Sequence, residues 1–515
     1  MRNPILAVLF SLVLFSGLAR AADDARLGPV YVLDVTVPDQ ASLHEIVESG
    51  YDVASVHGLT ATVYATPAER QTLLATGWPV TEVDQTADIE KTLGVYHTYD
   101  SLTTELVETY APLHPDICRL QSLGKSQQGR DLWAMLITDN PDVDEDEPEC
   151  KYIGTMHGDE PVGMELCLYL IDLLLNQYGY GTDERITTLV DNTALWIVPL
   201  MNPDGLTSNS RYNAQSYDLN RKFPNYPDDF TGTIFNTPLD VAGFPPEVAH
   251  IMNWTAQESF TLAANFHTGA LVVNYPYDYD ENVPSGQPAL SPDDALYQYI
   301  SQAYSSLNGP MSSNPKFDHG IVNGSDWYSI TGGMQDWDYR YAACNHVTVE
   351  LSNIERPEAP VLAQLWDDNR ESMLAYLETA QTGVRGIVTD AETGAPVYAQ
   401  VVIEGNNQPV FTDPDVGDYH RMLLPGTYTL HIAAPGYITE TIEGLAVEKG
   451  EAVRVDATLQ PQPMPATLSF AKLLLMLLLA LFGLRWLFGN TKSADANTSL
   501  AAGLLPMPHL LSPLW

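Results

Sequence analysis

The sequence predicts a central α/β domain over residues 94–381, with a small α+β module before it and an all-β sandwich after it. Three observations predict this division. Amphipathic helices alternate with apolar strands in the middle segment, as in α/β domains. Short strands and short helices alternate in residues 22–93, and short strands separated by Pro-Gly turns fill residues 382–460. A chain of 515 residues is also too long for one ordinary core.

Composition narrows the class of protein. A hydrophobic fraction of 45% is typical of globular domains. Sixty-six acidic residues against 24 basic ones argue against nucleic-acid binding, which needs basic patches. A solvated acidic surface is the interpretation we favour for the charge of −42, over attraction of cationic substrates. Four cysteines allow three complete pairings, and we favour free thiols or one or two disulfides over a disulfide-built scaffold: Cys118, Cys150, Cys167 and Cys344.

Both ends of the chain carry targeting patterns. Residues 1–21 have the charged start, apolar core and small-residue end of a secretory signal peptide, which predicts export to an extracellular or periplasmic compartment. Residues 461–489 combine a Pro-rich spacer with the apolar run Leu473–Leu484. We expect this segment to be a C-terminal membrane anchor rather than a removable tail or a packed end. Residues 490–515 form a tail without a readable pattern.

The first module is predicted as a split βαβ unit. Its strands are expected at residues 30–37, 51–57, 59–65 and 78–83, and its helices at 41–48 and 67–76. We find no catalytic constellation in it. A pro-segment that is later removed and a permanent packing domain are both compatible with the pattern, and residues 84–93 are expected to be a linker.

The central domain is predicted to begin with a helix at residues 102–110 and to end with a helix at 362–379. Buried strands are expected at 118–123, 132–138, 152–156 and 195–200, and a helix at 164–175. The acidic run 142–149 is interpreted as a solvated loop, because it lacks the ordered ligand spacing of a calcium loop. In the sandwich, strands are expected at 384–389, 399–403, 419–424, 427–432 and 452–459, with a structural or docking role.

A histidine and a glutamate follow the strand at 152–156. His157 and Glu160 stand at a strand-to-helix turn, where an imidazole nitrogen and a carboxylate oxygen could bind one zinc ion. The pair alone is weak support for a metal site. A second apolar strand ends in His267, and sites in α/β sheets lie at the carboxyl ends of strands.

From about residue 96 to 380 the chain resembles the zinc metallocarboxypeptidases, in the group that includes carboxypeptidases E, D, M and N. The matching motifs, in order, are Leu123-Gly-Lys-Ser-Gln-Gln-Gly-Arg-Asp-Leu-Trp133, His157-Gly-Asp-Glu160, Asn202-Pro-Asp-Gly205, Asp218-Leu-Asn-Arg-Lys-Phe-Pro224, Asn274-Tyr-Pro-Tyr-Asp278, Gly332-Gly-Met-Gln-Asp-Trp337 and Val347-Thr-Val-Glu350. The resemblance implies a mixed eight-stranded sheet flanked by helices, a transthyretin-like sandwich after it, and one zinc ion.

The resemblance also implies the roles of individual residues at the metal. His157, Glu160 and His267 would hold zinc, and Asp218 would orient His157 through its second ring nitrogen. Glu350 would be the general base that takes a proton from the attacking water. The substrates implied are peptides or proteins with a free C-terminus.

Further residues would bind the substrate. Arg221, with Asn220, would clamp the terminal carboxylate, since a guanidinium presents paired donors. Arg211 would stabilise the developing oxyanion, and Tyr328 would cover the bound substrate. For a basic C-terminal side chain, the implied partners are Asp278 and Gln335, although the loop also carries Asp280 and Glu281.

Two positions depart from the group. Asp159 stands where asparagine is usual, and Thr268 where glycine is common. The N-terminal module is not expected in this group either, and it is similar to pro-segments of digestive carboxypeptidases. The sequence therefore predicts an exported, membrane-anchored zinc carboxypeptidase that removes C-terminal Lys or Arg. Another specificity, such as cleavage of cell-wall peptides, and an inactive binding or adhesion protein are the alternatives.

Overall fold

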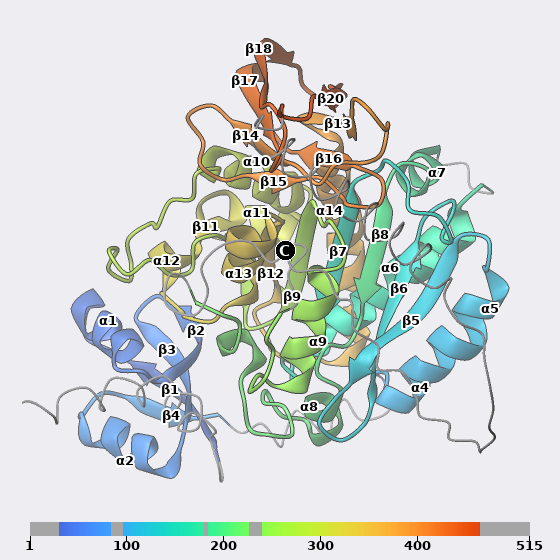
Figure 1. Cartoon of the computed structure of the whole chain (residues 1–515). Coiled ribbons are helices and arrows are strands. Elements are labelled where there is room, and N and C mark those ends of the chain that lie inside the picture. The colour runs from blue at the N-terminus through green and yellow to red at the C-terminus, as the bar shows by residue number, and fades with distance from the viewer. Residues whose placement is uncertain (1–29, 84–95, 180–183, 226–238, 464–515) are drawn as a thin grey trace, which may run out of the picture. The chain divides into compact units, whose positions relative to one another are not determined.

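The computed structural model of the chain describes residues 30–83, 96–179, 184–225 and 239–463 (Figure 1). The predicted signal peptide, the linker at 84–93 and the apolar run Leu473–Leu484 lie outside the described residues. Within them, no helix is both long and apolar enough to cross a membrane.

The N-terminal module, residues 30–83, is an antiparallel sheet in the order β2-β3-β1-β4 with two helices. Asp39 caps the first helix by accepting from the Ser42 amide, and Thr66 forms a capping box with Glu69 at the second. The predicted β-α-β-β-α-β order is confirmed. The elements are β1 (Tyr31–Thr36), α1 (Gln40–Glu48), β2 (Asp52–His57), β3 (Thr60–Ala65), α2 (Pro67–Ala75) and β4 (Val80–Glu82).

The central domain is built on an eight-stranded mixed sheet in the order β11-β10-β12-β9-β7-β8-β6-β5. Strands β12, β9, β7 and β8 are parallel neighbours. Strand β10 runs antiparallel to β12 but parallel to β11, and β6 runs antiparallel to both β8 and β5. Figure 1 shows β9, β7, β8, β6 and β5 side by side, from green to cyan. The strands are β5 (Cys118–Lys125), β6 (Asp131–Ile137), β7 (Glu149–Gly154), β8 (Ala194–Val198), β9 (Leu262–His267), β10 (Ala270–Tyr275), β11 (Ile321–Asn323) and β12 (Asn345–Ser352).

Both faces of this sheet are buried under helices. Tyr152 and Ile153 are successive residues of β7, and they point into two different hydrophobic clusters because strand side chains alternate between faces. The α-helices are α4 (Tyr99–Thr104), α5 (Ala111–Leu113), α6 (Val162–Gln177), α7 (Glu184–Val190), α8 (Pro203–Ser208), α9 (Pro246–Thr255), α10 (Asp294–Ser305), α11 (Gly309–Ser312), α12 (Gly324–Trp327), α13 (Met334–Ala342) and α14 (Leu362–Glu378).

Shorter helical turns join these elements. The predicted helix at 102–110 is confirmed, but its second half, η1 (Glu105–Tyr110), is a π-helical turn. Four 3₁₀ turns follow: η2 (Leu219–Arg221), η3 (Asp318–Gly320), η4 (Ala359–Val361) and η5 (Thr379–Gln381). All four cysteines are buried free thiols, so of the two possibilities, free thiols or one or two disulfides, the structure has the first.

After Gly383 the chain forms two small sheets, in the orders β16-β13-β19, with β20 also on β13, and β15-β14-β17-β18. The sandwich is joined to the central domain by a buried ion pair, in which Arg421 Nη2 lies 2.8 Å from Asp293 Oδ1. Its strands are β13 (Val384–Asp390), β14 (Gln400–Ile403), β15 (Val410–Phe411), β16 (Asp418–Arg421), β17 (Gly426–Ala433), β18 (Glu440–Val447), β19 (Val453–Arg454) and β20 (Ala457–Leu459). Strand β18 was not predicted.

Candidate active site

A tight turn after β7 brings His157 and Glu160 to the same side. The turn is held by a hydrogen bond from Thr155 Oγ1 to the Glu160 carbonyl, 3.1 Å. Gly158 packs directly on the turn at Gly205, where a Cβ on Gly158 would lie 2.0 Å from the Gly205 carbonyl carbon. Only glycine fits at this close approach of two backbones. The two sequence motifs, His-Gly-Asp-Glu and Asn-Pro-Asp-Gly, therefore depend on each other.

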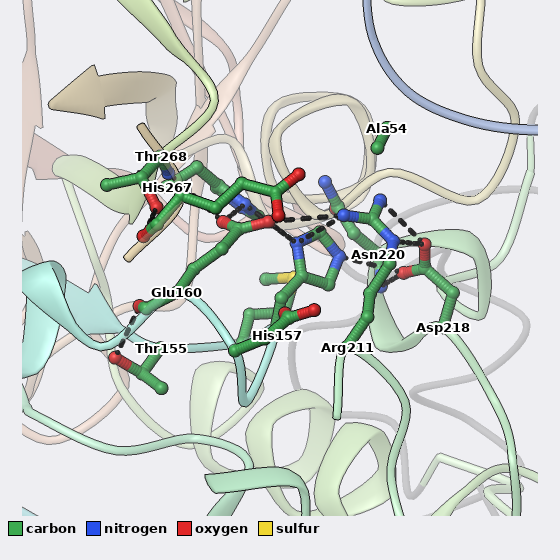
Figure 2. A network of polar contacts seen from close by, with 12 residues as sticks. Ala54, Thr155, His157, Glu160, Arg211, Asp218, Asn220, His267 and Thr268 are labelled. Atoms are coloured by element: carbon green, nitrogen blue, oxygen red, sulfur yellow. Dashed lines mark hydrogen bonds and ion pairs between the residues drawn. The ribbon is translucent and has the colours of Figure 1, made fainter. Parts of the chain in front are cut away.

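The side chains of His157, Glu160 and His267 converge on one buried point. Glu160 Oε1 lies 2.8 Å from His157 Nδ1, and Glu160 Oε2 lies 2.9 Å from His267 Nδ1. The two Nδ1 atoms are 3.1 Å apart, and one ligand atom from each residue lies within 4.8 Å of the others. Figure 2 shows the three side chains pointing toward one another. Two nitrogens and a carboxylate are a donor set that zinc accepts.

The hydrogen-bonding pattern around His157 and Glu160 is compatible with a bound cation. Asp218 Oδ1 accepts from His157 Nε2 at 3.0 Å, which leaves His157 Nδ1 as an acceptor that faces the carboxylate of Glu160. Acceptors that face one another need a donor or a cation between them. Arg211 Nη1 supplies one donor, 3.0 Å from His157 Nδ1 and 3.1 Å from Glu160 Oε1, and a metal ion would satisfy the same acceptors. Burial and Arg211 lower the pKa of His157, but Glu160 and Asp218 outweigh them and raise it to about 9. The residues present therefore fit a zinc ion.

Arg211 and Asp218 form a buried pair beside the convergence point. Arg211 Nη2 lies 2.9 Å from Asp218 Oδ2, and Arg211 Nη1 lies 3.1 Å from Glu160 Oε1. Burial opposes ionisation of Asp218, yet the charges of Arg211 and His157 hold its pKa well below the usual value. Asp218 also accepts from the backbone amide of Asn220 at 2.8 Å, which links the three converging side chains to the predicted substrate-binding residues.

Glu350 comes from the strand next to the one that ends in His267. In the parallel pairing of β12 with β9, Glu350 stands opposite His267. Its carboxylate is buried, and Oε2 has no hydrogen-bond partner among the described residues. Burial, together with repulsion from Glu160, raises the pKa of Glu350. A carboxylate with a raised pKa and a free oxygen is suited to accept a proton.

The predicted carboxylate clamp lies next to this group. Asn220 is buried, and its Oδ1 accepts from the Met334 amide at 3.0 Å. The Arg221 guanidinium is partly exposed and donates to the Val53 carbonyl at 3.0 Å. Tyr328 is buried, and its hydroxyl donates to the Ala54 carbonyl at 3.1 Å.

Of the three acidic residues in the loop after β10, the structure buries Asp278. Asp280 is half-buried and Glu281 is exposed. Asp278 Oδ1 accepts from Gln335 Nε2 at 2.8 Å, so the two residues predicted to act together are in contact. A Cβ on Gly324 would lie 1.9 Å from this oxygen, so glycine is required beside it. Burial and the charge of Asp336 raise the pKa of Asp278.

The N-terminal module also reaches the site, which the sequence did not predict. Strand β2 contributes the two carbonyls that Arg221 and Tyr328 contact, and His57 Nε2 lies 2.6 Å from the Gly269 carbonyl. Tyr64 donates to Asp159 Oδ2 at 2.8 Å. Backbone carbonyls occur at every residue and leave no sequence signal, so only the fold could reveal these contacts.

Comparison with known proteins agrees with this geometry. Residues 103–372 match the family model for zinc carboxypeptidases, and residues 383–460 match the carboxypeptidase regulatory-like domain. Human carboxypeptidase D is 41% identical over 370 residues, covering 68% of this chain but only 26% of that protein, so this chain spans about a quarter of that relative's length. Carboxypeptidase SOL1 of Arabidopsis thaliana is 39% identical over 382 residues, covering 74% of this chain and 75% of that protein.

A solved structure shares the fold. Carboxypeptidase A from Helicoverpa armigera superposes with a TM-score of 0.54 at 18% sequence identity, covering 68% of this chain and 97% of that one. At this identity the likeness establishes the fold alone. It agrees with the mixed eight-stranded sheet flanked by helices that the family resemblance implies.

Proposed function

The chain belongs to the zinc carboxypeptidase family, and we propose that it hydrolyses the last peptide bond of peptides or proteins, with a preference for C-terminal Lys or Arg. The observation that carries the proposal is the convergence of His157, Glu160 and His267 beside Glu350 and Arg221. A donor set for a metal, a proton acceptor and a carboxylate clamp close to one another are what this reaction would need, which supports the proposal.

His157, Glu160 and His267 would hold one zinc ion. When bound, zinc lowers the pKa of a coordinated water toward about 7 and polarises a carbonyl oxygen. Asp218 keeps His157 in the tautomer that offers Nδ1, through the 3.0 Å contact at Nε2. Burial of all three side chains excludes competing water and holds their donor atoms together.

Two side chains of the protein would carry out the proton transfer and the stabilisation of the oxyanion. Glu350 would accept a proton at Oε2, the oxygen that has no partner among the described residues, and pass it to the leaving amine. Arg211 would donate from Nη1 to the developing oxyanion, which requires that it give up part of its contact with Glu160. Its Nε contact to Asp218, 3.0 Å, would remain and keep the guanidinium oriented.

The substrate would be anchored by its C-terminus. The guanidinium of Arg221 offers paired donors to a carboxylate, and Asn220 stands beside it. Tyr328 would close over the bound residue. Asp278, held by Gln335, would meet a basic side chain, because a buried carboxylate with a raised pKa gains most from a cationic partner.

The N-terminal module would act as an inhibitory segment in the intact chain. Its carbonyls at Val53 and Ala54 occupy donors of Arg221 and Tyr328 that the substrate would need. We retain the predicted division of the chain at residues 22–93, 94–381 and 382–460. Export through residues 1–21 and anchoring through 461–489 remain part of the proposal, to be tested by N-terminal sequencing and by membrane fractionation with and without the last segment.

The test uses the full chain with a specific protease site inserted between Val83 and Tyr96. The intact and cut forms are supplied with zinc and, at high dilution, given peptides that differ only in a final Arg, Lys or Leu. We expect the cut form to release Arg and Lys faster than Leu, and a chelator to stop the release. Glu350→Gln should abolish turnover while zinc stays bound, and the exposed Glu358→Gln is the matched control.

Each alternative has its own outcome. Release of no residue by either form, with zinc bound, would favour an inactive binding protein. Equal release of Leu and Arg would leave a carboxypeptidase of another specificity and remove the role given to Asp278. Equal activity of the intact and cut forms would refute inhibition by the module.

A further inference from the structure

Two cavities lie on either side of the point where strand β2 crosses the site. The first, of about 470 Å³, is lined by Asp52 and Val53 of the strand together with Arg221. The second, of about 440 Å³, is lined by Ser55 and His57 of the strand together with residues of the central domain. Strand β2 therefore runs from the carboxylate clamp, past the metal ligands, to the second cavity.

The second cavity adjoins the metal ligands from the side opposite the clamp. It is lined by Asp159, the neighbour of Glu160, and by Gly269, two residues after His267. If the last residue of a substrate is held at Arg221, the chain before the scissile bond must leave across the metal point toward this cavity. Strand β2 already follows that path, with its Val53 carbonyl on Arg221 at 3.0 Å and His57 on the Gly269 carbonyl at 2.6 Å.

Two carboxylates of the central domain face this cavity. Asp159 is only 4% exposed, and its Oδ1 has no hydrogen-bond partner among the described residues. Glu355 follows strand β12, and its backbone carbonyl accepts from Thr268 Oγ1 at 2.5 Å, which ties it to the residue after His267. Burial and the charge of Asp159 raise the pKa of Glu355 to about 8. The charge of Arg211 opposes this rise without cancelling it, so a further cation in the cavity would be favourable.

In the intact chain the module supplies a weak substitute. Tyr64 donates its hydroxyl to Asp159 at 2.8 Å and to Glu355 at 3.4 Å. One hydroxyl cannot satisfy both carboxylates, and within the described part of the chain Asp159 Oδ1 has no hydrogen-bond partner. Arg356 also lines the cavity, but its guanidinium donates to Asn209 and lies 5.2 Å over the ring of Tyr96.

We propose that Asp159 and Glu355 form a subsite for a basic side chain upstream of the scissile bond. The enzyme would then recognise a second Lys or Arg in addition to the residue that it removes. This rests on the proposed function. A carboxylate pair beside a cavity of this size matches an ammonium or guanidinium group, which donates to both acids at once. The aspartate at 159 thus gains a role that asparagine could not fill, because an amide carries no charge.

The test uses whichever form of the full chain, intact or cut, releases C-terminal Arg. Hexapeptides with the same final Arg carry a single Lys, Gln or Glu at the second, third or fourth position from the end, with Ala elsewhere. At one of these positions we expect kcat/KM for Lys to exceed that for Gln by about tenfold, the size of one hydrogen bond to a charged group. Glu at that position should be the poorest substrate.

The variant Glu355→Gln should bring the Lys-to-Gln ratio close to one. Asp159→Asn should do the same, and zinc content measured for each variant shows whether the adjacent ligand Glu160 still functions. The exposed Glu358→Gln, which removes an equal charge outside the cavity, should keep the parent ratio. Equal kcat/KM for Lys, Gln and Glu at all positions would overturn the subsite but leave the carboxypeptidase intact. Failure to release Arg from any peptide would overturn the proposed function, and the subsite with it.

Discussion

Removing the hydroxyl of Tyr64 should weaken the binding of the N-terminal module over the candidate active site. In Tyr64→Phe the ring stays, and with it the stacking of Arg211, whose guanidinium carbon lies 5.1 Å from the ring centre. The lost group is the donor to Asp159, at 2.8 Å, and to Glu355, at 3.4 Å. The substitution therefore removes the donor shared by buried Asp159 and half-buried Glu355.

The size of the effect follows from that loss. A hydrogen bond to a charged group contributes about 1.5–3 kcal/mol, and a donor removed from a buried acceptor costs about as much. Each 1.4 kcal/mol is about tenfold in an equilibrium constant. The equilibrium between the covered and open cleft should thus shift about 10- to 100-fold toward the open form. Because the cut form lacks a tethered module, its activity should not respond to the substitution.

The assay is release of C-terminal Arg by the intact chain, expressed as a fraction of the cut chain's activity under the same conditions. Tyr64→Phe should raise this fraction by about tenfold or more, up to the limit set by the cut form. The control is Tyr31→Phe on strand β1 of the same module, whose ring lies under Arg70 instead of at the site. A rise no larger than that of the control would refute the reasoning.

Three further predictions concern other residues. Asp278→Asn should lower the preference for Arg over Leu by about 10- to 100-fold, measured as the ratio of kcat/KM values, since it removes one buried charge partner; an unchanged ratio would remove Asp278 from the specificity pocket. Asp338→Asn should lower the free energy of unfolding by about 3–5 kcal/mol, because buried Lys151, 2.9 Å from Asp338, would lose its counter-charge. Urea unfolding measures this, with the exposed Asp367→Asn as control. Zinc at about 100 times its Kd should raise the free energy of unfolding by about 2.7 kcal/mol in the same assay. In the His267→Ala variant, added zinc should give no such increase, even if the variant is itself less stable.

The sequence predicted those parts of the fold that depend on local pattern. The strand before His157 and the strands that carry His267 and Glu350 are short apolar runs, and each can be predicted without knowledge of its neighbours. Strand β18 was missed because Glu440–Val447 is a largely exposed edge strand without a buried face. Among Asp278, Asp280 and Glu281, only burial distinguishes the acid that contacts Gln335, and burial is a property of the fold.

Other features of the site had no sequence signal at all. The contacts of Val53 and Ala54 with Arg221 and Tyr328 are made by main-chain carbonyls, so any residue type would serve there. The departure at Asp159 was visible in the sequence, but it had no interpretation until the fold placed Glu355 beside it, 196 positions further along the chain by the printed numbering. Pairings between distant loops depend on the whole sheet, which local periodicity does not determine.

The order of charges along the cleft bears on the net charge of −42. Surface carboxylates are screened beyond about 8 Å at physiological ionic strength, so they cannot distinguish one residue of a peptide from the next. Groups inside the cleft can, because their contacts hold them in place. From one end to the other these are buried Asp278, partly exposed Arg221, the predicted metal ligands, and buried Asp159 with half-buried Glu355. That order would be complementary to a peptide with a basic last side chain, a terminal carboxylate, a scissile carbonyl and a basic residue upstream. Selectivity should therefore arise from these few groups and persist at salt concentrations that abolish any attraction by the surface.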